Sequence, residues 1–452
     1  SEPPEVRYRQ AVLADCLAHP EVARELYAIS VAALERERHF WMYSANYPVS
    51  LLGRSIDLLG AVLVQLRRLR AIANEQLGSF TSEGFQRLFR EISAELDDGY
   101  LHSVEDHLRG LQFRDGVHLS ATLGTLNSDT AFVLRRRVAP LAWRERIGLD
   151  EADSYSWELD PRDMAGADAL GALRSRGIAL AAGALGESTD HIVSYFRQLR
   201  TELGFYLGCL NLRDLLAAKG EPICLPEPLA CGQSTIGAHG LYDVCLSLSL
   251  GPARAVGNDF GADGKSLIVI TGANRGGKST FLRSLGQAQL MLQAGMFVPA
   301  ESFRADIRHG LFTHFRREED ATQEHGKLDE ELGRMSEIVD EVRPGSLVLL
   351  NESFASTNER EGSEIARQIV RALLESGVKV GYVTHMYDLA DRLHAEHDGD
   401  ALFLRAERLA DGRRTFRVVE GEPLPTSHGE DIYRQIFERV APTQSAPTAA
   451  KG

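Results

Sequence analysis

The segment Gly272-Ala-Asn-Arg-Gly-Gly-Lys-Ser-Thr280 constrains the fold of this chain more than any other stretch. It follows an apolar run at residues 266–270, which predicts a buried β-strand. It opens an apolar-periodic segment at residues 281–294, which predicts a helix. A strand, a glycine-rich turn and a helix in this order are the structural context of a G-x-x-x-x-G-K-S phosphate loop. The segment therefore predicts a site for a nucleoside triphosphate.

The residue types of this loop suit phosphate. Backbone N–H groups of the turn and the helix start point at the phosphates, where the helix dipole favours negative charge. The glycines let the backbone approach closely, Lys278 can reach the β- and γ-phosphates, and the Ser279 hydroxyl can ligate Mg²⁺. We therefore predict ATP and Mg²⁺ as cofactors. The predicted nucleotide contacts are Gly272, Ala273, Asn274, Arg275, Gly276, Gly277, Lys278, Ser279 and Thr280.

Composition is that of an ordinary globular protein. The 452 residues are 44% hydrophobic and 25% charged, enough for about two or three domains. We find no apolar run that approaches the roughly 20 residues of a membrane span, and the acidic, proline-containing start is unlike a signal peptide. The five cysteines have neither metal-ligand nor disulfide spacing, which fits a reducing compartment. We expect a cytoplasmic protein without a membrane partner.

The formal net charge is −14, which argues against non-specific coating of nucleic acid. It does not conflict with a local basic channel in an oligomer. Among the basic residues, the arginines at 67, 68, 70 and 135–137 fit a solvated helix face better than phosphate contacts.

Residues from about 20 to 219 have a mostly helical pattern. Apolar residues recur at helical spacing over four segments, 51–72, 85–96, 100–111 and 189–218. Ser188 or Thr189 is a suitable cap for the last of these, and residues 116–133 fit strand or turn. We therefore predict a mostly α-helical core and lever domain at residues 1–220.

The pattern changes after a proline-rich connection at residues 222–228. Short β-like runs precede the phosphate loop, and two further buried strands, at 347–350 and 378–383, flank a helix at 361–375. Strands that alternate with helices predict an α/β domain, with a mainly parallel sheet flanked by helices, at residues 221–440. Residues 441–452 are rich in proline, alanine, threonine and serine, which predicts a disordered tail.

Two strand ends supply the other residues that a phosphate-loop enzyme needs. The strand at 347–350 runs into Asn351 and Glu352, where Asp-Glu is the usual pair and the Asp helps to hold Mg²⁺. Glu352 is the candidate base that orients or deprotonates water, whereas Asn351 has lost the charge, which predicts weaker metal binding or slower turnover. His385 follows the strand at 378–383, where it faces the ligand crevice and can sense the γ-phosphate. The predicted catalytic set is Glu352, His385 and Lys278, and the predicted metal positions are Ser279 and Asn351.

Residues 271–280 resemble the phosphate loop of the MutS family, whose pattern is T-G-x-N-x-G-G-K-S-T. Asn274 and the double glycine separate this pattern from most other P-loop ATPases. Further pieces resemble the family in its order: Gly257-Asn-Asp259, Phe297-Val-Pro-Ala300, Leu311-Phe-Thr313, the Walker B and D-loop segment at 351–362, Val383-Thr-His-Met-Tyr-Asp-Leu389 and Ser427-His-Gly429. The resemblance is strong from about residue 203 to 440. It implies an ABC-type ATPase domain that forms a homodimer with nucleotide sites at the interface.

The chain departs from the family pattern in two ways. The family's G-x-S-T-F-x-x-E signature reaches across the dimer to the partner's nucleotide, and here the stretch is Gly326-Lys-Leu-Asp-Glu-Glu-Leu332, in which Glu331 matches the glutamate and the serine is missing. The length leaves no room for the mismatch-recognition domain with its Phe-x-Glu wedge, which implies a short member of the family. Phe89-Arg-Glu91 matches that tripeptide, but Phe89 has a core spacing in an amphipathic helix.

The resemblance implies a DNA-binding ATPase of the mismatch-repair type, in which ATP controls closure of the dimer on duplex or branched DNA with low specificity. Two alternatives are open. The acidic charge and the missing wedge domain favour a nucleotide-gated switch that binds a protein partner without DNA contact. Asn351 and the altered signature favour an ATP-binding clamp that hydrolyses ATP poorly.

Overall fold

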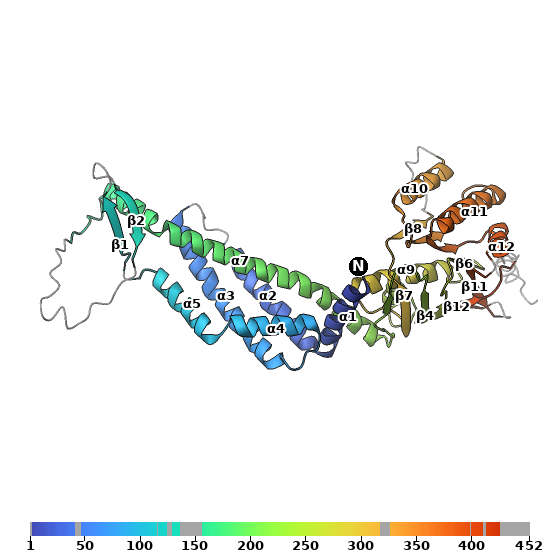
Figure 1. The fold of residues 1–452 in the computed structure, drawn as a ribbon, viewed down its shortest axis with the longest axis horizontal. Coiled ribbons are helices and arrows are strands. Elements are labelled where there is room, and N and C mark those ends of the chain that lie inside the picture. Colours follow the sequence, from blue (N-terminus) through green and yellow to red (C-terminus); the bar gives the residue numbers. More distant parts are fainter. Residues whose placement is uncertain are drawn as a thin grey trace, which may run out of the picture. The chain divides into compact units, whose positions relative to one another are not determined.

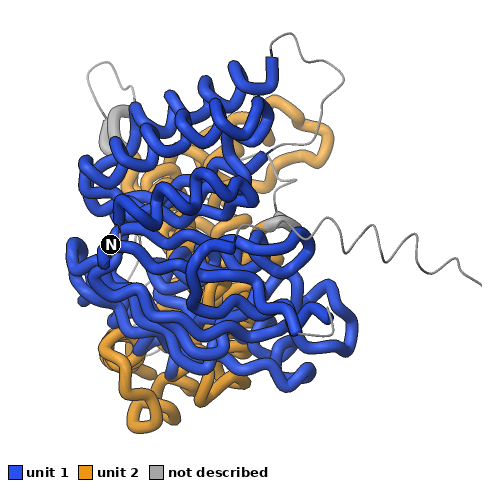
Figure 2. Tube along the Cα trace, turned by 90° about the vertical axis from the view of Figure 1, so that its right-hand side faces the viewer, with its two compact units in different colours: residues 1–14, 209–452 blue, residues 15–208 orange. Residues whose placement is uncertain are grey.

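The computed structural model describes residues 2–40, 47–114, 116–123, 129–135, 156–316, 326–397, 399–409 and 413–424. The chain divides into two compact units, residues 15–208 and residues 1–14 with 209–452 (Figure 2). The boundaries between these units, after residues 14 and 208, each fall inside a helix. The domain boundary that we predict after residue 220 stays a prediction. The predicted tail at 441–452, the segment Ser427-His-Gly429 and the arginines at 136 and 137 lie outside the described residues.

The unit of residues 15–208 is mostly helical (Figure 1). Its elements are α2 (Pro20–Phe40), α3 (Pro48–Gln76), α4 (Glu83–Glu95), α5 (Asp98–Leu111), the antiparallel strands β1 (Leu119–Leu123) and β2 (Asp129–Leu134), and most of α7 (Met164–Ala218). The predicted helices at 51–72, 85–96 and 100–111 are thereby confirmed, and the mixed segment at 116–133 contains a hairpin.

Helix α7 corrects one of the predicted boundaries, because it begins at Met164 rather than near residue 189. Residues 164–188 are rich in alanine, the best helix former, but their glycines obscure the apolar period. Ser188 and Thr189 do not cap the helix. Their hydroxyls donate to carbonyl groups one turn back, Ser188 to Ala184 at 2.9 Å and Thr189 to Leu185 at 2.7 Å. A further helix, α1 (Pro3–Ala18), precedes the helical pattern that begins at about residue 20 and lies within the domain of residues 1–220 that we predict to be mostly helical.

Helix α3 corrects the prediction about membrane spans. By length and composition alone, this helix of 29 residues is long and apolar enough to cross a membrane. Its buried apolar residues, which include Leu59, Leu63 and Leu66, lie within the helical unit, where α3 packs against α2, α4 and α5. A helix that buries its apolar stripe against neighbouring helices needs such a composition.

The core of the helical unit contains Phe89, as its spacing predicts. Its ring is fully buried and lies 5.2 Å from that of Phe80 and 5.5 Å from that of Phe85, measured between ring centroids. Phe89 is therefore a core residue and not a wedge. The arginines at 67, 68 and 70 form ion pairs with Glu105, Glu25 and Asp98, which agrees with a solvated helix face.

The second unit contains a six-stranded sheet in the order β12-β11-β6-β10-β9-β8. Its strands are β6 (Leu267–Thr271), β8 (Leu311–Phe315), β9 (Leu347–Asn351), β10 (Lys379–Val383), β11 (Ala401–Arg408) and β12 (Arg414–Glu420). All neighbouring pairs are parallel except β11 with β12. The sheet is therefore mainly parallel, as predicted. A separate sheet has the order β3-β7-β4-β5, with strands β3 (Glu227–Leu229), β4 (Ile236–Leu241), β5 (Asn258–Gly261) and β7 (Ser302–Asp306).

Helices cover both faces of the six-stranded sheet (Figure 1). They are α9 (Lys278–Ala294), α10 (Lys327–Glu341), α11 (Glu359–Glu375) and α12 (Tyr387–Glu396), with the short α8 (Val244–Ser249) beside α9. Alternate residues of β6 enter two cores, because Ile268 and Ile270 pack with α9, whereas Leu267 and Val269 pack with α10, α11 and α12. This double burial explains why β6 is an unbroken apolar run and why its carboxyl end is fixed firmly.

One buried carboxylate makes a testable contribution to the helical unit. Asp15 accepts hydrogen bonds from the backbone N–H groups of Thr81 at 3.0 Å and Ser82 at 2.8 Å, and from the Thr81 hydroxyl at 3.1 Å. Burial raises the pKa of Asp15, but the hydrogen bonds from Ser82 and Thr81 outweigh it, so that the pKa is lowered. We expect Asp15→Asn to reduce the free energy of unfolding by about 1–3 kcal/mol at neutral pH, measured by urea unfolding.

The lowered pKa fixes the sign of the pH dependence. The advantage of wild type over Asp15→Asn is complete above the unfolded-state pKa of about 4 and is lost as the pH falls through the lower folded value. The exposed Asp106→Asn serves as a control and changes stability by less than about 0.5 kcal/mol. A difference between wild type and Asp15→Asn that grows in acid would contradict this account.

Candidate nucleotide-binding site

The glycine-rich loop connects the buried strand β6 to the first residue of α9. Gly277 lies immediately before α9 in the left-handed region, with φ 96°, and a Cβ there would lie 2.9 Å from the carbonyl oxygen of Phe416. A Cβ on Gly276 would lie 2.7 Å from that of Ala406. The glycines are therefore required by the close approach of β11 and β12, which cross the loop.

Lys278 is held inside this loop. Only 5% of the residue is exposed, and its Nζ donates to the carbonyl oxygens of Gly272 at 2.8 Å and Ala273 at 3.1 Å, with Asn274 Oδ1 at 3.5 Å. Burial lowers the pKa of Lys278, and the charge of Glu352 opposes that effect. The loop thus gathers its backbone carbonyls around one buried amine, which is the group predicted to contact phosphate.

The two predicted metal positions are in direct contact. The Ser279 hydroxyl, in the first turn of α9, donates to Asn351 Oδ1 at 2.7 Å. Asn351 is the last residue of β9, and β10 lies between β9 and β6 in the sheet. This hydrogen bond therefore joins the phosphate loop to a strand end that is 72 residues away in the sequence.

Glu352 and His385 form the next pair. Glu352 Oε1 lies 3.7 Å from His385 Nδ1, and the backbone N–H of Glu352 donates to Val383 at 2.8 Å. The contact with His385 lowers the pKa of Glu352, burial opposes this, and the charges of Lys278 and Arg316 lower it further. Glu352 is therefore a carboxylate at neutral pH, as a base must be.

The structure brings all the predicted site residues together at one edge of the sheet. They come from the loop after β6 and from the ends of β9 and β10, which are three neighbouring parallel strands. Thr280 is half-buried in the first turn of α9. The catalytic, nucleotide-binding and metal-binding roles of these residues stay predictions.

A buried polar layer behind Glu352 was not predicted from the sequence. His314 of β8 contacts Ser353 through Nδ1 at 2.7 Å and the carbonyl oxygen of Glu331 through Nε2 at 3.0 Å. Glu331 is 4% exposed, and its Oε2 accepts from the backbone N–H of Phe354 at 2.7 Å. The carboxylate of Glu331, which matches the glutamate of the family signature, thus contacts the backbone of its own chain. The only sequence signal was the position of Ser353 and Phe354 directly after Glu352.

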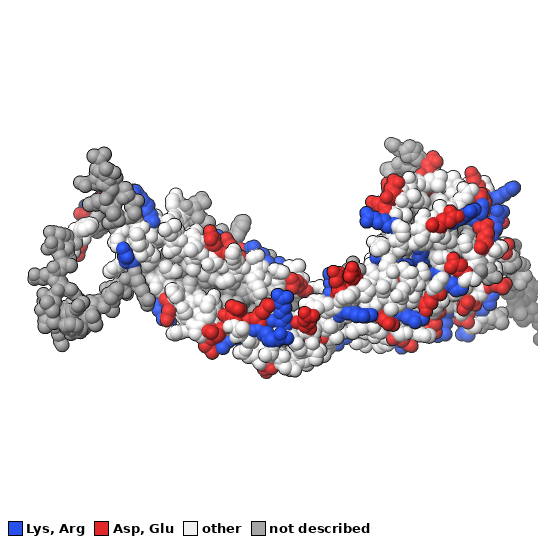
Figure 3. All heavy atoms as spheres, in the orientation of Figure 1, with Lys and Arg blue, Asp and Glu red and all other residues white. Residues whose placement is uncertain are grey.

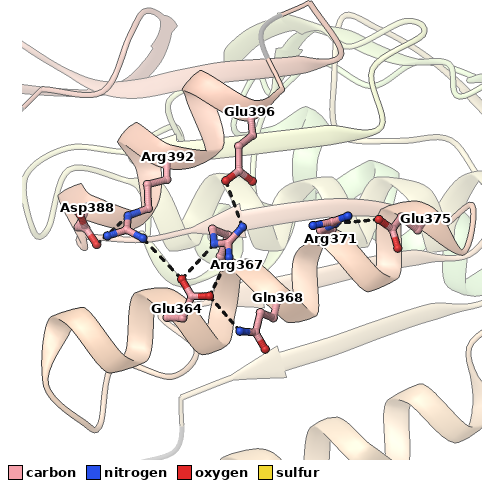
Figure 4. Close-up of polar contacts among 8 residues, drawn as sticks. All are labelled: Glu364, Arg367, Gln368, Arg371, Glu375, Asp388, Arg392 and Glu396. Atoms are coloured by element: carbon pink, nitrogen blue, oxygen red, sulfur yellow. Dashed lines mark hydrogen bonds and ion pairs between the residues drawn. The ribbon is translucent and has the colours of Figure 1, made fainter.

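Charged residues elsewhere on this unit are extensively paired. Glu364 of α11 contacts Arg367 at 2.7 Å, Gln368 at 2.9 Å and Arg392 of α12 at 3.5 Å (Figure 4). The hydrogen bonds from Arg367 and Gln368 lower the pKa of Glu364 to about 2. On the face drawn in Figure 3, basic and acidic side chains are interspersed over the described residues. That face lacks a continuous basic surface of the kind that binds the phosphates of a DNA backbone.

Comparison with known proteins agrees with this geometry. The family described as MutS2 N-terminal domain matches residues 1–219, and that described as MutS domain V matches residues 268–437. The chain belongs to the MutS family. The match to domain V includes the phosphate loop, Glu352 and His385, and the N-terminal match covers all of the helical unit.

Several members of the MutS family are similar to parts of this chain. Endonuclease MutS2 of Thermus thermophilus is 35% identical over 40% of this chain and 24% of its own length. Endonuclease MutS2 of Pelotomaculum thermopropionicum is 30% identical over 55% of this chain and 29% of its length. DNA mismatch repair protein MutS of Thermotoga maritima is 36% identical over 30% of this chain and 17% of its length. The chain thus spans less than a third of each of these relatives.

The packing of the loop predicts the effect of a single methyl group. Gly277→Ala strains a left-handed residue and crowds the carbonyl of Phe416, so we expect a loss of about 1–3 kcal/mol in thermal or urea unfolding. Gly333→Ala, in the exposed part of α10 with no atom within 4 Å of the new Cβ, is the matched control. It should be neutral or stabilise by up to about 1 kcal/mol. Equal stabilities of the two variants would contradict the described approach of β12.

Proposed function

We propose that this chain binds and hydrolyses ATP at the edge formed by β6, β9 and β10. The observation that carries the proposal is the 2.7 Å hydrogen bond from Ser279 to Asn351, which places the phosphate loop against the strand end that bears Glu352. The loop, the base and the histidine lie far apart in the sequence and yet meet at this edge. Such a meeting of a phosphate loop, a carboxylate and a histidine is the arrangement that nucleotide hydrolysis requires.

Each residue takes a separate role in this proposal. The loop N–H groups and Lys278 bind the phosphates, with Thr280 beside them, and Glu352 orients water and accepts its proton. The water oxygen forms a bond to the γ-phosphorus while the bond to the bridging oxygen breaks, and that oxygen leaves with ADP. His385 donates to the γ-phosphate. Its contact with Glu352, 3.7 Å between Nδ1 and Oε1, keeps the imidazole and the carboxylate side by side.

The donor set at Ser279 and Asn351 fits Mg²⁺. Both side chains offer oxygen atoms, the ligand type that this ion prefers, and neither carries a charge. Mg²⁺, when bound, neutralises charge on the phosphates. Ser279 would hold it directly, and Asn351 would hold one of its waters. Because the carboxylate usual at position 351 is missing, this site should bind the ion weakly.

Membership of the MutS family supports a role on DNA in a homodimer. One of the relatives named above is a DNA mismatch repair protein. In this role, ATP would draw the paired ATPase domains, residues 221–440, together on duplex or branched DNA. The helical domain, residues 1–220, would provide the arms, in a cytoplasmic protein without a membrane partner. The net charge of −14 and the paired arginines favour the second candidate, a nucleotide-gated switch that binds a protein.

ATP turnover with and without DNA tests the proposal. We expect ATP hydrolysis above that of Glu352→Ala, stimulated severalfold by mismatched or branched duplex DNA, measured as phosphate release. Lys278→Ala should abolish nucleotide binding, measured with a fluorescent ATP analogue. An ATP turnover rate that is the same with and without DNA would support the nucleotide-gated protein switch instead. ATP binding without turnover would support the ATP-binding clamp. Retained ATP affinity in Lys278→Ala would overturn the site.

Asn351→Asp tests the metal assignment. Restoring a carboxylate next to Ser279 should lower the Mg²⁺ concentration needed for half-maximal hydrolysis by about tenfold, which corresponds to about 1.4 kcal/mol. Mg²⁺ titrations of turnover give this value. Asn358→Asp, which changes a helix cap on the same unit, is the control and should leave the titration unchanged. An unaltered Mg²⁺ dependence in Asn351→Asp would show that position 351 does not face the ion.

A further inference from the structure

We propose that Glu331 of α10 is a positioning residue for Glu352 and acts within its own chain through the backbone that follows Glu352. The inference rests on the proposed ATP hydrolysis, which assigns Glu352 as the base. It concerns a different group, because Glu331 is buried behind the site and contacts neither the loop nor the predicted metal positions.

The conformation of the backbone at the base needs support. Glu352 has φ 53° and Phe354 has φ 64°, so two residues with side chains lie in the left-handed region within three positions. This conformation is unfavourable for residues other than glycine, and it persists only where surrounding contacts fix it. The direction of the Glu352 carboxylate therefore depends on the contacts that hold residues 352–354.

Two neighbouring elements, β10 and α10, supply three of those contacts. The N–H of Glu352 donates to Val383 of β10 at 2.8 Å, and the hydroxyl of Tyr382 donates to the carbonyl of Ser353 at 2.7 Å. From the other side, Glu331 Oε2 accepts from the N–H of Phe354 at 2.7 Å. Of these three contacts, the last involves a side-chain carboxylate in the interior, where such a hydrogen bond is stronger than in water.

His314 ties the same turn to α10 a second time. A carbonyl oxygen only accepts, so the contact of Nε2 with the Glu331 carbonyl at 3.0 Å identifies Nε2 as the protonated nitrogen. Burial lowers the pKa of His314, and its Nδ1 lies 2.7 Å from the Ser353 hydroxyl, which donates to the backbone carbonyl of His314 at 2.9 Å. The ring also stacks on Phe354, with 5.3 Å between centroids. Residue 331 is thus joined to residue 353 and to residue 354.

Helix α10 packs Leu328, Met335 and Ile338 against the core, and Arg334 donates to the carbonyl oxygen of Phe315 at 3.0 Å. Its buried residues are Glu331 and Met335, whereas Leu332 and Val339 on its outer side are exposed. The position of α10 and the conformation of the backbone after Glu352 are therefore coupled through the Glu331 carboxylate and through His314. Removal of that carboxylate should misdirect the base and lower kcat, while the loop that binds nucleotide is undisturbed.

The test compares Glu331→Ala with Glu331→Gln in the full chain. We expect Glu331→Ala to lower kcat by about 10- to 100-fold, with the Kd for a fluorescent ATP analogue within about twofold of wild type. Glu331→Gln retains an oxygen that can accept from Phe354 N–H and should recover most of kcat. Glu337→Ala, on the exposed side of α10, is the matched control and should behave as wild type.

Turnover per nucleotide-binding site distinguishes positioning from a loss of folded protein. Misdirection of the carboxylate in Glu331→Ala should lower kcat per site, with sites counted by stoichiometric binding of the fluorescent ATP analogue, and Glu331→Gln should restore it. A smaller fraction of folded enzyme would lower the number of sites and the turnover in equal proportion, so that kcat per site would be unchanged. If Glu331→Ala does not fold, His314→Asn, which removes the contact between α10 and Ser353, should give the same loss of kcat per site.

The outcomes separate this inference from the proposed function. Wild-type turnover no greater than that of Glu352→Ala would refute the hydrolysis and the inference with it. Turnover by wild type, combined with unchanged kcat per binding site in Glu331→Ala and in His314→Asn, would refute the inference alone. Equal losses of kcat and nucleotide affinity would also refute it, because Glu331 would then support the whole unit.

Discussion

The parallel pairing of β10 with both β6 and β9 is the constraint on which the site depends. Val383 lies opposite Ile270 on one side and opposite Asn351 on the other, so the next residues of all three strands emerge in one row. Parallel strands place their carboxyl ends at the same edge, and burial on both faces fixes their register, since a shift by one residue would turn apolar side chains the wrong way. The loop, Glu352 and His385 meet because these three strands cannot slide.

Around this edge, polar groups of the same chain satisfy one another. Lys278 donates to loop carbonyls, Ser279 donates to Asn351, and Glu331 accepts from Phe354. Buried polar groups are costly unless they are hydrogen-bonded, so these contacts keep an unusual backbone in place at small cost. The same reasoning explains why two left-handed residues persist next to the strand end.

The sequence predicts the parts of this site whose signals are local. The apolar runs of β6, β9 and β10 and the amphipathic helices α9 and α11 were identified within about three residues, because each pattern lies in one short window. The start of α7 was missed since glycines dilute its apolar period, and α3 looked shorter than it is. The contact of His314 with Ser353 joins residues 39 apart, and no local pattern encodes such a pairing.

The replacement of the usual aspartate by Asn351 has a physical consequence. Asn351 places a neutral amide beside Ser279, and the Glu331 carboxylate contacts the backbone N–H of Phe354 rather than this position. The asparagine reduces the negative charge that the edge of the sheet presents to a metal ion. The charge that remains there belongs to Glu352, whose ionisation is secured by His385, Lys278 and Arg316 of the same chain. The capacity of this edge for catalysis therefore depends on how well the chain's own packing holds one carboxylate.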